Sequence, residues 1–115
     1  MSDLLNSLVT ELRRGSLTLA VLSQLKTPQY GYSLAQRLND HGMKIDQSTL
    51  YPLLRRLEKQ KVVSSSWDTS ENRPRKYYVL SEYGEEVFQA LKGHWENTTK
   101  ELNTLLKGGN NNEDD

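Results

Sequence analysis

Apolar residues recur along the first forty positions at the three- and four-residue intervals of amphipathic helices. Leucine and valine take such positions in residues 2–13 and again in 17–25, and the polar run 14–16, with Gly15 at its centre, predicts a break between two helices. A third helix is predicted from Tyr30 to His41 and ends at Gly42, a residue type that favours the left-handed backbone of a helix end. We therefore expect three short helices in this region.

The clearest helical pattern follows Asp46. Leu50, Leu53, Leu54 and Leu57 stand at positions i, i+3, i+4 and i+7, which predicts one buried stripe. Asp46 is the expected N-cap, because its carboxylate can accept from the amide of residue 48 or 49. Proline at position 52 falls beyond the first turn, so the opening turn is expected to be irregular or kinked. The opposite face is polar and basic.

Two short strands are expected next, at 62–67 and 75–80, joined by the polar turn 68–74 into a hairpin. From residue 81 the pattern becomes a heptad seam, narrower than the apolar face a helix needs to cover a globular core. Its members are Gly84, Phe88, Leu91, Trp95, Thr98, Leu102 and Leu105. A helix over 81–107 extends roughly 40 Å, longer than the rest of the chain can cover, so a second copy of the same helix is the expected partner.

The expected fold class is mainly α with a small β-hairpin. We assign residues 1–80 to one domain, 81–107 to a C-terminal dimerisation helix, and 108–115, which lack apolar residues, to a disordered tail. The alternative to the dimer is that the C-terminal helix packs only against the rest of its own molecule.

Formal net charge is zero, but its distribution along the 115 residues is uneven. Residues 1–80 hold 12 Lys and Arg against 7 Asp and Glu, a balance of +5, while residues 81–115 hold 3 against 8, a balance of −5. Phosphate binding responds to the local patch and not to the total. A basic helix followed by a basic hairpin is typical of a protein that places a helix in the major groove and contacts phosphates with the hairpin. Double-stranded DNA is therefore the expected partner.

Other classes of protein fit poorly. The chain has no cysteine and two histidines, neither beside an acid and a nucleophile, which argues against an enzyme, a structural zinc site or a cofactor. The N-terminus is unlike a signal peptide and no apolar run approaches a membrane span. The expected location is the cytoplasm.

Contacts to DNA are expected from the basic helix, whose N-terminal residues lie nearest the base edges, and from the base of the hairpin. The predicted DNA-binding residues are Gln47, Ser48, Thr49, Tyr51, Arg55, Arg56, Lys59, Arg73, Arg75 and Lys76. Plainer interpretations remain open: Tyr51 as a half-buried packing aromatic, Arg56 and Lys59 as ordinary surface charge, and Arg75 and Lys76 as partners of the hairpin's own acids.

Three segments together resemble the PadR family of bacterial transcriptional regulators over about residues 15–85. They are Leu17-Thr18-Leu19 through Tyr30-Gly31-Tyr32, Ser48-x-Leu50-Tyr51-Pro52-x-Leu54-x-x-Leu57-Glu58, and Arg73-Pro74-Arg75-Lys76-Tyr77-Tyr78-x-Leu80-Ser81-x-x-Gly84. The resemblance implies a winged helix-turn-helix, a dimer formed through the C-terminal helix, and usually repression. Many members of the family respond to phenolic or other aromatic compounds.

The short C-terminal part is similar to a subgroup with a single C-terminal helix that includes multidrug-pump repressors. Trp95 follows Gly84 by eleven positions, as the tryptophan does in that subgroup, where two symmetry-related tryptophans sandwich flat aromatic ligands. The resemblance thus implies an effector site at Trp95, although the residues around it do not match the subgroup closely. Phe88 and Leu91, which lie nearby on the seam, are the expected further walls. The residues expected at the dimer interface are Leu4, Leu8, Phe88, Leu91, Trp95, Leu102 and Leu105. Trp95 as a packing residue alone remains the alternative.

The expected function is therefore a sequence-specific transcriptional regulator, a dimeric repressor of a pseudo-palindromic operator that a small aromatic effector relieves. A winged-helix module that binds other proteins, or an architectural DNA binder of low specificity without an effector, are the alternatives.

Overall fold

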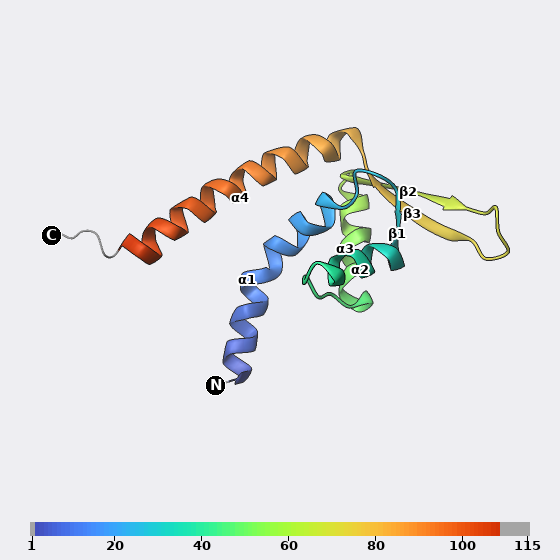
Figure 1. The fold of residues 1–115 in the computed structure, drawn as a ribbon. Coiled ribbons are helices and arrows are strands. Elements are labelled where there is room, and N and C mark those ends of the chain that lie inside the picture. Colours follow the sequence, from blue (N-terminus) through green and yellow to red (C-terminus); the bar gives the residue numbers. More distant parts are fainter. Residues whose placement is uncertain (1, 109–115) are drawn as a thin grey trace.

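Four helices and a three-stranded sheet make up the computed structural model, which describes residues 2–108 (Figure 1). In chain order the elements are α1 (Ser2–Ser23), β1 (Gln29–Tyr30), α2 (Gly31–Asp40), α3 (Gln47–Lys59), β2 (Val63–Asp68), β3 (Arg75–Leu80) and α4 (Glu82–Gly108). The predicted fold class, mainly helical with a small sheet, is confirmed. Gly108 ends α4, and the remainder of the predicted tail, 109–115, lies outside the described residues.

The core lies where α2, α3 and the C-terminal half of α1 meet. Leu50 and Leu54 of α3 are fully buried against Leu22 and Leu34, and Leu53 and Leu57 are nearly so. The predicted stripe is thus confirmed. The Asp46 carboxylate accepts from the amide of Thr49 at 3.0 Å, as expected for the N-cap, and the helix runs on through Pro52. Gly42 has φ +86°, which confirms the left-handed backbone predicted after α2.

The predicted break in the first helix is wrong. Residues 2–23 form one helix, and Gly15 lies in its interior with nothing within 4 Å of the position a Cβ would take. Glycine inside a helix costs about 1 kcal/mol relative to alanine. That cost is too small to interrupt a helix whose C-terminal half is anchored in the core by Val21 and Leu22.

The predicted two-stranded hairpin is incomplete, because the sheet has a third strand. The strand order is β1-β3-β2 and both pairings are antiparallel. Strand β1 consists of Gln29 and Tyr30, paired with Tyr78 and Tyr77, so Tyr30 belongs to the sheet and α2 begins only at Gly31. A two-residue strand has no alternation of its own, and only its distant partner β3 defines it.

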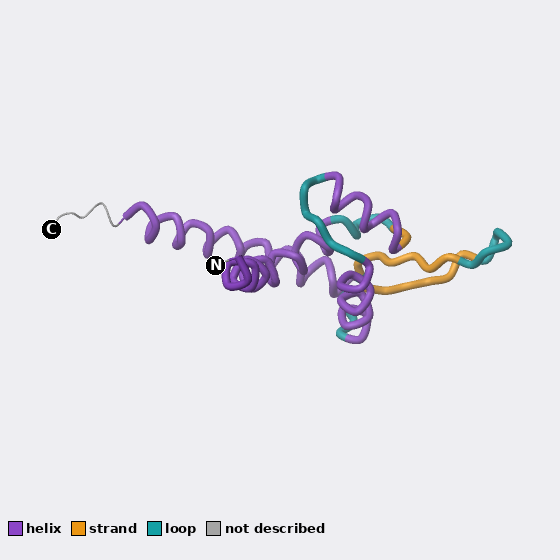
Figure 2. The backbone as a smooth tube through the Cα atoms, turned by 90° about the horizontal axis from the view of Figure 1, so that it is seen from below, coloured by secondary structure: helices purple, strands orange, loops and turns teal. Residues whose placement is uncertain are grey.

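Helices α1 and α4 extend from this body as two arms (Figure 1). In both views the hairpin tip and the C-terminal end of α4 lie at opposite ends of the molecule (Figure 2), which measures 68 × 35 × 23 Å. Of the predicted seam on α4, Gly84 and Phe88 are buried within the protomer, whereas Leu91 is 36% exposed. The uncovered part of the seam therefore starts at Leu91.

Candidate nucleic-acid interface

Helix α3 presents a basic ridge opposite its buried leucines. Residues 48, 55 and 59 share this outward face by helical periodicity, and the side chains of Ser48, Arg55 and Lys59 are exposed. Gln47 and Thr49 are exposed at the N-terminal end. The ridge thus offers two cations and short polar side chains on one continuous surface.

The N-terminal turn of α3 is held by Asp46. The Ser48 hydroxyl donates to its carboxylate at 2.7 Å, and this bond, followed by those from Thr49, lowers the pKa of Asp46 below its usual value. The Ser48 proton is therefore already used. In this state its oxygen can accept a hydrogen bond, but it cannot donate to a phosphate.

A hollow of about 780 Å³ lies beside the ridge, between the start of α2, α3 and the hairpin. Four predicted DNA-binding residues come together there: Tyr51, Arg73, Arg75 and Lys76. Sequence reasoning missed two large aromatics on the same surface, Tyr32 and Trp67, whose side chains are 65% and 63% exposed. A signal for Trp67 was present in the sequence: a large aromatic at the end of a short strand, in a hairpin whose second strand begins with basic residues, suits a wing that touches a groove.

Side-chain contacts fix two of the wing cations. The Lys76 ammonium lies 3.5 Å from a Glu58 oxygen and 5.5 Å from the centre of the Tyr78 ring. Its acid partner belongs to α3 and not to the hairpin, so this ion pair ties the wing to the ridge. The Arg75 guanidinium stacks 4.9 Å over the ring of Tyr30. Arg73 is exposed in the turn.

The Tyr30 and Tyr77 rings stack with their centres 4.1 Å apart and join β1 to the hairpin. The Tyr77 hydroxyl donates to that of Tyr30 at 2.6 Å, and Tyr30 donates to Asp68 at 3.2 Å. The hydrogen bond with Tyr77, and then burial, raise the pKa of Tyr30 to about 12, so this tyrosine is neutral at physiological pH. The stack sets the position of Arg75 relative to α2.

Tyr51 is half-buried over Gly31. A Cβ at Gly31 would overlap the Tyr51 ring, so the glycine lets the aromatic settle on the start of α2. This is the packing role that the sequence left open, and the ring edge still lines the hollow. Arg56 and Thr49 lie on the other flank of α3, toward α1, away from the wing.

The residues expected at the effector site and the dimer interface differ in how far they are buried. Phe88 is 6% exposed, packs in the core and lies 5.5 Å from the Lys26 ammonium, so it has little surface left for a ligand or a partner. Trp95 is 48% exposed, and Leu102 and Leu105 of α4 and Leu4 and Leu8 of α1 are exposed as well. Two helical arms therefore carry uncovered apolar faces.

Other kinds of site have little support within residues 2–108. In that range no three His, Cys, Asp or Glu side chains are grouped closely enough to hold a metal ion. None of the helices there is both long and apolar enough to cross a membrane.

Comparison with known proteins gives consistent matches. The model of the transcriptional regulator PadR-like family matches residues 18–90. A PadR family transcriptional regulator from Eggerthella lenta is 44% identical, with 92% of this chain and 95% of that chain covered and a TM-score of 0.85. A PadR-like transcriptional regulator from Bacillus cereus is 31% identical, covering 85% and 98%, with a TM-score of 0.75. An uncharacterised protein from Lysinibacillus sphaericus is 27% identical over 104 residues, covering 86% and 95%.

Proposed function

The chain belongs to the PadR-like family of transcriptional regulators, and from this premise we propose that it is a dimeric repressor whose hold on a specific operator is weakened by a small aromatic effector. That it is a DNA-binding regulator and not an enzyme follows from the family. The observation that carries the specific proposal is the exposed basic ridge of α3, flanked by the hollow that gathers Arg73, Arg75 and Lys76.

In the proposed complex α3 lies in the major groove. Gln47 at its N-terminal end reads a base edge, with adenine as its favoured partner, and Arg55 and Lys59 hold the phosphates or bases below the ridge. The wing cations meet the neighbouring phosphates, and Trp67 packs against the sugar-phosphate backbone. Lys76 keeps its ion pair with Glu58, so Arg73 and Arg75 supply most of the wing's attraction.

We propose that residues 1–80 form the DNA-binding unit and 81–107 the dimerisation helix. Support comes from the two uncovered faces, which carry Leu4, Leu5, Leu8, Val9 and Leu12 on α1 and Leu91, Trp95, Leu102, Leu105 and Leu106 on α4. An apolar surface of this extent on a small protein marks an interface. A symmetric dimer that sets two α3 helices roughly 34 Å apart would recognise a pseudo-palindromic operator. As a regulator of chromosomal genes it would act in the cytoplasm.

The proposed effector site uses Trp95 and Leu91. Phe88 is too buried to form a wall, so the ligand would lie between the indole of Trp95 and the same residue of the partner copy. A planar aromatic suits two such faces. It relieves repression only if it favours a spacing of the two α3 helices that the operator does not accept.

Trp95→Ala should weaken the dimer about tenfold, because large aromatics near the centre of an interface carry much of its binding energy. Sedimentation equilibrium measures the dimer dissociation constant. Tyr83→Ala is the matched control, an exposed aromatic near the start of α4 and off the seam. An unchanged dimer constant for Trp95→Ala would exclude this seam as the interface. In Trp67→Phe protein, quenching of the remaining Trp95 fluorescence then reports aromatic ligands directly.

Fluorescence anisotropy tests the regulatory function. The DNA upstream of the protein's own gene should bind at least about 10³-fold more tightly than scrambled DNA of equal length, the lower end for specific recognition. Equal binding to both, falling steeply with salt, would indicate an architectural protein. Binding to neither at low salt would contradict the DNA-binding role and leave a protein-docking module.

A further inference from the structure

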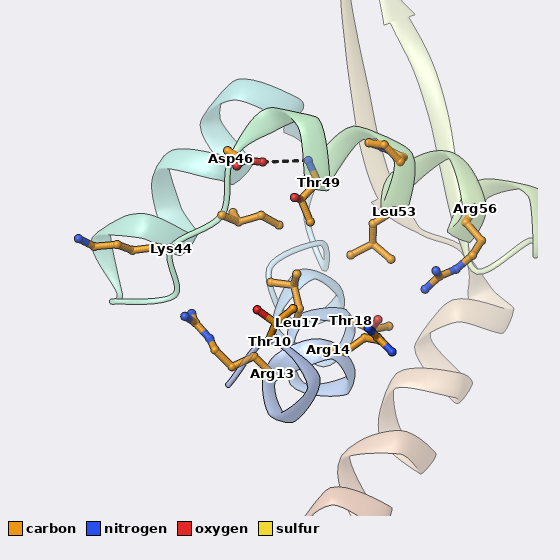
Figure 3. Close-up of a pocket in the computed structure, with 12 residues that line it drawn as sticks. Thr10, Arg13, Arg14, Leu17, Thr18, Lys44, Asp46, Thr49, Leu53 and Arg56 are labelled. Atoms are coloured by element: carbon orange, nitrogen blue, oxygen red, sulfur yellow. Dashed lines mark hydrogen bonds between the residues drawn. The ribbon is translucent and has the colours of Figure 1, made fainter. Parts of the chain in front are cut away.

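A second hollow lies on the other flank of α3, between this helix and α1 (Figure 3). Its volume is about 440 Å³, within the range of sites for small molecules. It has no lining residue in common with the hollow between α2, α3 and the hairpin, and Trp95 does not line it. None of the functions proposed above uses it as a cavity.

Four cations surround this α1–α3 hollow: Arg13 and Arg14 from α1, Lys44 from the loop before α3, and Arg56 from α3. In Figure 3 Arg13 and Lys44 lie on one side of it and Arg14 and Arg56 on the other. Among residues 2–108 the only ion pair is Lys76 with Glu58, so none of these four cations forms an ion pair with a carboxylate. Arg13 donates only to the Met43 sulfur, at 3.3 Å.

One acid, Asp46, also lines the hollow, but it is engaged elsewhere. Its carboxylate accepts from Ser48 and Thr49 as the cap of α3, and these bonds lower its pKa. The hollow as a whole therefore has a cationic excess of three charges.

The space between the cations is mainly apolar. Leu17 of α1 and Leu53 of α3 point toward each other across it (Figure 3). Ile45 and Pro52 add apolar surface, and the rest of the lining is the short side chains of Thr10, Thr18 and Thr49. An apolar centre between separated cations suits a molecule with a hydrocarbon body and an anionic group. A DNA phosphate does not need the apolar centre, since exposed Lys and Arg side chains are enough to hold it.

We propose that the α1–α3 hollow binds a small organic anion, a carboxylate or phosphate ester with an apolar body. The anionic group pairs with the guanidinium or ammonium groups, and the body lies on the partly exposed Leu17, Ile45 and Pro52, with the nearly buried Leu53 behind them. Binding at this site needs only the folded protein and holds whether or not the chain acts on an operator.

A regulatory consequence follows, and this part rests on the proposed function. Arg56 and Thr49 line the hollow and are also predicted DNA-binding residues. An anion that engages Arg56 removes a cation from the DNA, and it also links α1, an arm of the proposed dimer, to the reading helix. The bound anion therefore lowers DNA affinity.

Titration of ¹⁵N-labelled full-length protein with cyclohexanecarboxylate, in the absence of DNA, tests the site. Its saturated ring cannot stack on Trp95 as a flat aromatic would. We expect saturable amide shifts confined to residues around 10–18 and 44–56, with a dissociation constant on the order of 1 mM or below for so small a probe. Neutral cyclohexanemethanol and inorganic phosphate should each bind at least about tenfold more weakly, because each lacks one half of the required chemistry.

The variant Arg14→Gln/Lys44→Gln removes one cation from each side and should weaken the carboxylate about tenfold. Lys100→Gln/Lys107→Gln, which removes the same charge from exposed positions on α4, should leave it unchanged. Equal weakening in both variants, shifts centred on α4, or no shifts up to about 10 mM would each overturn the proposal. So would phosphate binding as tightly as the carboxylate. Because DNA is absent, these outcomes do not depend on whether the regulatory function holds.

Discussion

Replacing Gly84 by alanine should destabilise the protein by about 3 kcal/mol, at the upper end for overpacking a core position. A Cβ at Gly84 would overlap the carbonyl oxygen of Val62, which is backbone and cannot rotate away. The same carbonyl accepts from the Ser81 amide at 3.0 Å, and the Ser81 hydroxyl accepts from the Gly84 amide at 2.8 Å. An added methyl group must therefore push α4 off the end of β2 and break the cap of the helix.

Gly15→Ala is the matched control for this change. Gly15 is also inside a helix, but its surroundings are open, so alanine there should stabilise the protein by about 0.5–1 kcal/mol through helix propensity. Urea unfolding followed by circular dichroism measures both, at one protein concentration because any self-association would shift the transition. If the two variants moved stability in the same direction, close packing of Gly84 on Val62 would be contradicted.

Arg55→Ala should lower affinity for the operator by about 10² or more. The side chain lies at the centre of the exposed ridge of α3, and losing one such contact costs about 1–3 kcal/mol, a loss that the proposed symmetric dimer would suffer twice. Anisotropy across a salt series separates two cases. A contact to a base reduces the preference over scrambled DNA, whereas a contact to a phosphate weakens both and lowers the salt slope by about one unit per half-site.

Lys100→Ala removes a positive charge from the face of α4 opposite the seam and serves as the control. It should change affinity less than about twofold, as expected of a screened, distant charge. Equal losses for Lys100→Ala and Arg55→Ala would mean that net charge and not the ridge controls binding.

Features set by neighbouring residues could be predicted from the chain. The leucine stripe of α3, its Asp46 cap and the left-handed Gly42 each depend on a few consecutive positions, and all three are confirmed. The prediction that failed most plainly, a break at residues 14–16, gave a local signal too much weight. The cost of one glycine is about 1 kcal/mol, and the burial of Val21 and Leu22 outweighs it.

Features that join distant residues could not be predicted. Strand β1 exists because Tyr30 pairs and stacks with Tyr77, 47 positions later. The ion pair between Glu58 and Lys76 joins a helix to a strand, and no pattern in the sequence connects these two residues. Phe88 and Trp95 share one heptad pattern, yet the first is buried in the protomer and the second is half exposed.

The chain alone thus predicted α2, α3 and α4, the pairing of β2 with β3, the basic ridge and the family, because helical periodicity, capping and charge are properties of short segments. Tertiary structure alone decided where the uncovered seam begins, and it divided the predicted DNA-binding residues between the two flanks of α3. It also placed four cations from α1, the loop before α3 and α3 around one apolar hollow. The reason is geometric: whether a side chain is free, paired or covered depends on the elements packed beside it, and those come from distant parts of the chain.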